Sequence, residues 1–114
     1  MRPHRTTVAA LLAGASLALV SQGISAQTPA GNAENVKNKL AMCIGCHGIE
    51  GYRTAYPDVY HVPKITGQQP AYIVKALQAY RSGERSHPSM RGIAKGLTDA
   101  EMADFAAYYG GTQK

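Results

Sequence analysis

Two cysteines three positions apart, Cys43 and Cys46, with His47 directly after the second, constrain this chain more than any other feature. A C-x-x-C-H run is the attachment motif of a c-type haem. Positions three apart lie on the same side of a helical turn, so both thiols can reach one edge of a porphyrin and add to its two vinyl groups. The histidine then lies under the iron and supplies an axial ligand. The motif therefore predicts one covalently bound haem c, with its iron, per chain.

The same residues admit three other interpretations: a redox-active dithiol, part of a zinc site, or chance. A thioredoxin-like dithiol belongs beside a β-α-β pattern, which the sequence does not contain. A tetrahedral zinc site needs four ligands at suitable spacing, and the 2 cysteines of the chain both lie in the motif. Haem attachment is the interpretation that the surrounding sequence favours.

Residues 1–26 have the pattern of a secretory signal peptide. A basic start precedes an apolar run over 8–20, and a small-residue cleavage pattern ends at Ala26. The apolar run is short for a transmembrane span, although an uncleaved membrane anchor is the alternative. We therefore expect export to the periplasm and no membrane span in the mature chain. The expected organisation after cleavage is a short linker over 27–31 and one domain over 32–111.

Three segments have the start signals and apolar spacing of helices. Asn32 is a suitable N-cap for a first helix that runs into Cys43. Pro70 suits the first position of a second helix, which Gly83 should end. Residues 98–101 form a capping box at the start of a third helix, which we expect to cross the first. No segment has the pattern of a strong strand, so the expected class is all-α.

Two long stretches, 48–69 and 83–97, lack a persistent period and are rich in glycine and proline. Loops of this length are unusual in a small domain unless they are functional or lie against a bound group. We expect both to be loops that wrap around the haem. Three main helices and these two loops would then enclose one cofactor.

A second axial ligand is expected in the later loop. Methionine opposite histidine raises the potential of a haem, and Met90 lies at the centre of the 83–97 stretch. Met42 adjoins the attachment motif, and Met102 lies on the apolar stripe of the last helix. His61 and His87 are the alternative ligands. We expect Met90 to bind the iron.

A histidine that binds a metal usually donates its second ring N–H to an acceptor that fixes the ring. For His47, the backbone carbonyl groups of Pro57 and Pro63 are both candidates by their position in the following stretch.

The region from Asn32 to Gly110 resembles a class I cytochrome c of the small soluble bacterial type, and is similar to single domains of the two-haem periplasmic cytochromes c. The family's P-x-L-x-G-Q run corresponds to 63–68, with Ile65 where leucine is common. Its proline orients the proximal histidine and its late methionine ligates the iron, which implies these roles for Pro63 and Met90. The other matching segments are 43–48, 80–85, 97–99 and 106–109.

The resemblance implies a cytochrome c fold and a periplasmic electron-transfer protein with His/Met axial ligation. We expect its partners to be membrane-bound or periplasmic redox proteins, such as a reductase or an oxidase. The alternative is a haem c subunit of a larger oxidoreductase complex, and a third reading is a gas-binding or peroxidatic haem protein. No acid–base constellation suggests an enzyme. The net charge of +5 is too small to indicate nucleic-acid binding.

Overall fold

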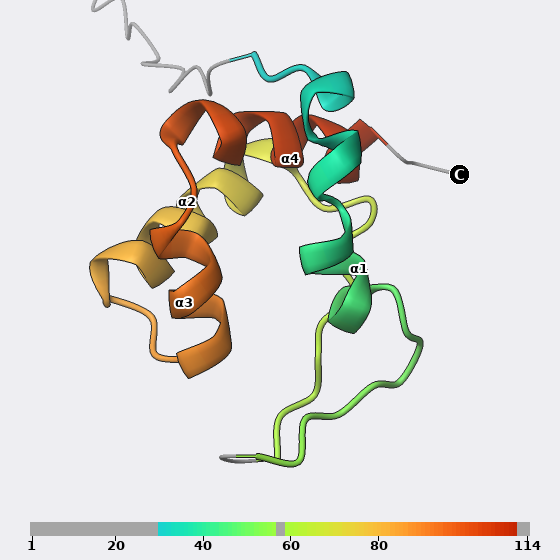
Figure 1. The fold of residues 1–114 in the computed structure, drawn as a ribbon, viewed down its shortest axis with the longest axis vertical. Coiled ribbons are helices and arrows are strands. Elements are labelled where there is room, and N and C mark those ends of the chain that lie inside the picture. The colour runs from blue at the N-terminus through green and yellow to red at the C-terminus, as the bar shows by residue number, and fades with distance from the viewer. Residues whose placement is uncertain (1–29, 57–58, 112–114) are drawn as a thin grey trace, which may run out of the picture.

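The computed structural model describes residues 30–56 and 59–111. These ranges contain a 3₁₀ helix and four α-helices (Figure 1), which confirms the expected all-α class. Among the described residues, β-pairing is limited to one isolated bridge between Arg53 and His61. The expected signal peptide lies outside the described residues. The elements are η1 (Ala33–Lys39), α1 (Ala41–His47), α2 (Pro70–Ser82), α3 (Pro88–Lys95) and α4 (Asp99–Gly111).

The first helical segment begins where the sequence indicates, but it is divided. The Asn32 side chain accepts a hydrogen bond from the Glu34 N–H at 3.0 Å, as expected of an N-cap. The next residues form η1 in 3₁₀ geometry, which is common in short pieces at helix starts. Leu40 then connects η1 to α1 with helical backbone angles. The expectation of one continuous helix into Cys43 was therefore wrong in geometry, although the chain stays helical.

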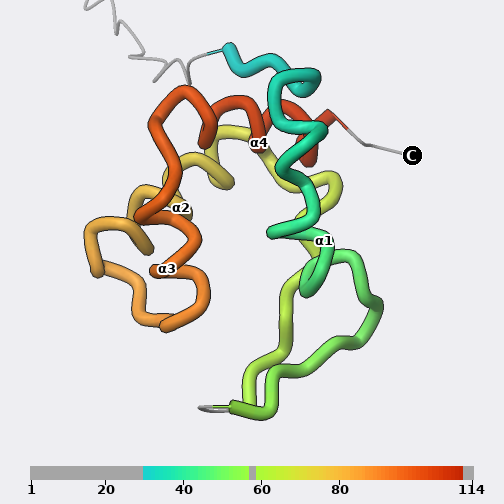
Figure 2. Tube along the Cα trace, viewed as in Figure 1, coloured from blue at the N-terminus to red at the C-terminus, as the bar shows by residue number. Residues whose placement is uncertain are grey.

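α4 crosses η1 closely, because two features hold them together. A side chain at Gly31 would place its Cβ 2.0 Å from the carbonyl oxygen of Ala103. Asp104 of α4 accepts hydrogen bonds from the Asn32 N–H at 2.6 Å and from the Asn35 amide at 3.1 Å. The start of the domain is thus held against α4. Figure 2 shows η1 crossing α4.

α2 begins and ends, and α4 begins, where the sequence predicts. Pro70 is at the first turn of α2, and Gly83 ends it with a positive φ of 90°. At the start of α4, Thr98 N–H donates to the Glu101 carboxylate at 2.9 Å, and Glu101 N–H donates to the Thr98 hydroxyl at 3.2 Å. The two helices pack against each other. The buried core comprises Val36, Ile73, Val74, Ala94, Leu97, Met102, Phe105, Ala106 and Tyr109.

The expectation of a loop over 83–97 was wrong, because this stretch contains α3. Pro88 occupies the first turn, where its missing N–H is not needed. The His87 ring caps the helix by accepting from the Met90 N–H at 3.4 Å. Ala94 is fully buried, and α3 packs against α2. Met90 is consequently held on a helix rather than in a flexible loop.

The segment between α1 and α2 is a loop, as expected, in its described residues. It extends beyond the end of α1 and returns toward α2 (Figure 2). Backbone hydrogen bonds join its two arms, from Thr54 N to Tyr60 O at 2.9 Å and from Val62 N to Tyr52 O at 3.0 Å. Over the residues that the structure covers, none of the helices has both the length and the apolar character that crossing a membrane requires.

Candidate haem site

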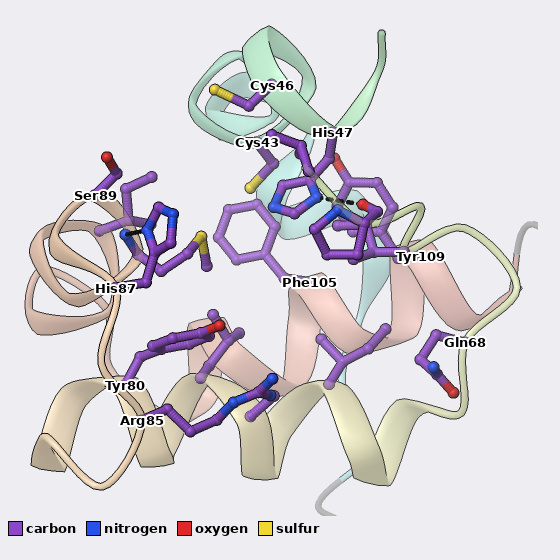
Figure 3. Close-up of a pocket in the computed structure, with 18 of the residues that line it drawn as sticks. Cys43, Cys46, His47, Gln68, Tyr80, Arg85, His87, Ser89, Phe105 and Tyr109 are labelled. Carbon is purple, nitrogen blue, oxygen red and sulfur yellow. Dashed lines mark hydrogen bonds between the residues drawn. The ribbon is translucent and has the colours of Figure 1, made fainter. Parts of the chain in front are cut away.

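A cavity of about 440 Å³ is enclosed by side chains of all four α-helices and of the loop after α1. Its wall is mostly apolar, and no aspartate or glutamate of the described residues contributes to it. Figure 3 shows the cavity with Phe105 of α4 between the attachment motif and His87. The five residues expected at the site all line it: Cys43, Cys46, His47, Pro63 and Met90.

Most of the residues of α1 belong to the attachment motif. None of its residues is buried, so its contacts with the rest of the protein are few. Cys43 is half-buried and Cys46 is exposed, and both are free thiols. Figure 3 shows both cysteines and His47 projecting from α1 at one end of the cavity. This arrangement would present two thiols to one edge of a planar group bound in the cavity.

His47 is held in one orientation by the backbone of Pro63. Its Nδ1–H donates to the Pro63 carbonyl oxygen at 2.7 Å. Because a carbonyl can only accept, Nδ1 carries the proton and Nε2 keeps a free lone pair. A neutral imidazole with this second hydrogen bond is the usual state of a metal-binding histidine. The acceptor for His47 that the sequence suggested is therefore present, while Pro57 lies outside the described residues.

Tyr109 contacts the attachment motif, and the sequence did not point to it as a site residue. The Tyr109 hydroxyl and the Cys43 thiol influence each other electrostatically, and burial raises the pKa of both groups above their usual values. Tyr109 and Phe105 lie four positions apart on the α4 stripe that predicted only a core. They also line the cavity, because α4 passes behind α1. The apolar spacing was the available signal, and it does not distinguish a core from a cofactor wall.

Met90 lies on the first turn of α3 and is half-buried. The neighbouring His87 stacks against Tyr60 of the long loop, with ring centroids 4.8 Å apart. The loop and the start of α3 therefore meet beside Met90. Met42 also lines the cavity from α1, whereas Met102 is fully buried in the core and takes no part in the wall.

The other two candidate ligands are engaged in hydrogen bonds. Arg53 Nε donates to His61 Nε2 at 2.9 Å, and His87 Nδ1 accepts from the Met90 N–H. Both rings also line the cavity. Each histidine thus has a structural role that uses one ring nitrogen.

The residues present fit a covalently attached haem. Two free thiols and an imidazole with an available Nε2 lie at one end of a mostly apolar cavity. A thioether sulfur lies elsewhere on the same wall. Thiols that can bond to vinyl groups, and an imidazole and a thioether that can bind iron, form the donor set that such a cofactor needs.

The cytochrome c family model matches residues 33–110. This chain belongs to the cytochrome c family. It is 39% identical over 83 residues to cytochrome c-554(548) of Halomonas halodenitrificans, an alignment that covers 70% of this chain and 95% of that protein. Proteins of this family transfer electrons on a covalently bound haem c. The chain is therefore an electron-transfer protein of the small bacterial class I type, and haem c is its cofactor.

Two further relatives of this cytochrome are matched over a smaller share of their own length. Cytochrome c4 of Pseudomonas aeruginosa is 35% identical over 80 residues, which cover 70% of this chain and 38% of that protein. The cytochrome subunit of sulfide dehydrogenase of Chlorobaculum tepidum is 36% identical over 72 residues, with coverages of 63% and 61%. The chain thus spans less than half of the cytochrome c4 that it matches.

Proposed function

We propose that this cytochrome c is a periplasmic carrier of single electrons, with haem thioether-linked to Cys43 and Cys46 and ligated by His47 and Met90. The observation that carries this proposal is the shared cavity wall, to which all four side chains contribute. The hydrogen bond from His47 to Pro63 supports it further, because it leaves Nε2 available. When bound, haem c supplies the one-electron redox couple.

The protein supplies ligands and an environment for that couple. The Pro63 carbonyl makes the imidazole of His47 a better electron donor and prevents the ring from rotating. The soft sulfur of Met90 would favour ferrous iron, which would raise the potential and keep small molecules from binding the iron. Met90 is favoured over His61 and His87 because those rings are engaged with Arg53 and with the start of α3. These features favour a carrier over a gas-binding or peroxidatic protein.

The location and partners are also proposals. Residues 1–26 would direct the chain to the periplasm, where haem c is attached. A thiosulfate dehydrogenase electron acceptor of Stutzerimonas stutzeri is 39% identical over 71 residues, which supports exchange of electrons with a dehydrogenase or another redox protein. The second candidate function is that of a haem c subunit in such an oxidoreductase. The match to the Chlorobaculum tepidum subunit favours it.

Covalent attachment is the first prediction. The full chain should be expressed in a bacterium that matures c-type cytochromes and purified from its periplasm. Its intact mass should equal that of the processed polypeptide plus one haem, and the haem should stay with the protein after acid–acetone extraction. The Cys43→Ser and Cys46→Ser variants are controls that each lose one attachment bond. An unmodified polypeptide with all haem in the extract would exclude the proposed function.

Purification from the native host separates the two candidate functions. A carrier should elute alone at the size of the single chain. A haem c subunit should co-purify in constant ratio with a larger redox protein.

A further inference from the structure

Tyr60 of the long loop lies against His87, the N-cap residue of α3. The centroids of the two rings are 4.8 Å apart and the ring planes are tilted by 59°, a separation and tilt that aromatic pairs favour. Both rings line the cavity. The contact joins two segments that are far apart in the sequence, so it links the loop after α1 to the start of α3.

On the α3 side, His87 holds the turn that carries Met90. Its ring Nδ1 accepts from the Met90 N–H at 3.4 Å, and its backbone carbonyl accepts from the Arg91 N–H at 2.9 Å. Arg91 in turn lies against the end of α2, because its guanidinium is 3.6 Å from the position that a Cβ of Gly83 would take. A change at the His87 ring would therefore be transmitted to the backbone of Met90.

On the loop side, the opposite arm of the loop fixes the backbone of Tyr60. Its N–H donates to the Thr54 hydroxyl at 3.1 Å, and its carbonyl oxygen accepts from the Thr54 N–H at 2.9 Å. The next residue, His61, pairs with Arg53 through the isolated β-bridge and through a side-chain hydrogen bond. Tyr60 is thus anchored by its backbone while its ring contacts His87.

The segment over 60–63 therefore contacts the supports of both proposed axial ligands. The Pro63 carbonyl oxygen accepts from His47. Three positions earlier, the Tyr60 ring packs on the residue that caps the turn of Met90. A ligand that is held by the surrounding structure leaves a metal less often, because its departure must also break the contacts that hold it.

We propose that Tyr60 is a positioning residue for the distal ligand: its ring holds His87, and with it the first turn of α3, so that the Met90 thioether stays on the iron. This inference rests on the proposed function, because it requires Met90 to be that ligand. When the thioether leaves the iron, the first turn of α3 opens and the contact between the two rings is lost. Removing the contact beforehand therefore raises the fraction of molecules in which the iron is open to other ligands.

The test compares Tyr60→Leu with Tyr56→Leu in haem-loaded protein. Tyr56 belongs to the same loop, but it is 87% exposed and does not line the cavity, so its variant removes the same ring elsewhere. Added imidazole binds ferric iron only when the thioether has left, and its apparent affinity therefore reports the open fraction. The measurement is made on folded protein, so a loss of global stability alone does not change it.

Tyr60→Leu should bind imidazole about 2-fold to 12-fold more tightly than the wild type, which is the factor that one aromatic pair contributes to an equilibrium. Tyr60→Phe keeps the ring and should match the wild type. Tyr56→Leu should also match it. A Tyr60→Leu variant with the same affinity as Tyr56→Leu would overturn the inference.

A double-variant cycle tests whether Tyr60 acts through His87. His87→Asn keeps a side chain that can cap α3 but removes the ring. Tyr60→Leu should therefore tighten imidazole binding in the wild type and have no further effect in His87→Asn. Equal effects of Tyr60→Leu in both proteins would show that Tyr60 does not act through this ring, and would reject the proposed route.

If Tyr60→Leu yields no haem-loaded protein, the wild type carries the test. In the ferrous low-spin state, NMR should show cross-peaks between the ring protons of Tyr60 and His87, as centroids 4.8 Å apart require. Their absence would overturn the inference and leave the proposed function intact. A ferric wild type without a sulfur-to-iron charge-transfer band would instead refute Met90 as a ligand, and the inference with it.

Discussion

Met90 and Met102 differ in surroundings rather than in chemistry. Met102 is completely buried in the core, and Met90 lies on the cavity wall. The thioether of Met90 is the proposed iron ligand, whereas that of Met102 is enclosed by apolar side chains. Substitution of each by alanine should therefore give different results.

Met90→Ala should lower the midpoint potential and allow carbon monoxide to bind the ferrous protein at neutral pH, because the proposed soft ligand of the iron would be lost. Redox titration and carbon monoxide difference spectra measure both effects. The matched control is Met102→Ala, which should reduce the free energy of unfolding by about 2–5 kcal/mol and still exclude carbon monoxide. If Met90→Ala keeps both the potential and the exclusion, His61 and His87 become the ligands to test.

At the residue level, much of the site could be predicted from the sequence. The spacing of Cys43, Cys46 and His47 is set by the covalent chemistry of haem attachment, so the motif can be recognised without a structure. Tyr109 could not be identified in this way. Its place on the wall depends on how α4 packs, and an apolar stripe has the same appearance in many proteins.

Among the elements, α4 shows why capping signals are reliable. The reciprocal hydrogen bonds between Thr98 and Glu101 involve residues three apart, so they depend on local sequence alone. The structure adds a long-range contact, because Lys39 of η1 pairs with the same Glu101 carboxylate. Glu101 thus stabilises both the start of α4 and its crossing with η1.

The Glu101 contacts predict a stability change at acid pH. Hydrogen bonds from Lys39 and Thr98 lower the pKa of Glu101 from 4.5 to about 2. Since the folded pKa is below the unfolded value, the stabilisation is fully present above pH 4.5 and is lost as the pH falls toward 2. Urea denaturation midpoints of the wild type and Glu101→Gln should therefore differ at neutral pH and converge on acidification. A difference that stays constant down to pH 2 would contradict this assignment.

α3 is the element that the sequence did not reveal. The sequence of this stretch is typical of a loop, because it contains Pro88, Gly92 and Gly96. The helical spacing of Met90 and Ile93 was therefore not recognised. Pro88 is compatible with the first turn, and His87 is an uncommon N-cap whose ring nitrogen replaces the usual oxygen. The helix forms because Ala94 is buried and α3 packs against α2. Local helix propensity does not include this tertiary contribution.

For the whole molecule, the distribution of burial predicts that folding depends on the cofactor. The core joins η1, α2, α3 and α4, while α1 has no buried residue. The cavity lies between that core and α1. In a domain of this size, a bound group that fills such a space contributes a large share of the buried apolar surface.

Replacing both attachment cysteines, Cys43→Ala with Cys46→Ala, should give a largely disordered and protease-sensitive protein when it is free of haem. Circular dichroism during heating and limited proteolysis measure this, and the haem-loaded wild type is the reference. A cooperative thermal transition in the haem-free double variant would show that the polypeptide folds without its cofactor.

The apolar wall of the cavity also has a consequence for the speed of electron exchange. When the charge at a redox centre changes by one unit, nearby dipoles reorient, and the free energy of that reorganisation adds to the activation barrier. Here the imidazole of His47 is fixed by Pro63, and Met90 is fixed on α3. Most of the surface of the cavity wall is apolar, so a change of charge in the cavity would reorient little of its surroundings. The reorganisation free energy should therefore be small, because the surroundings need not rearrange between the oxidised and reduced states. Electron exchange is then fast even when the difference in potential between the partners is small.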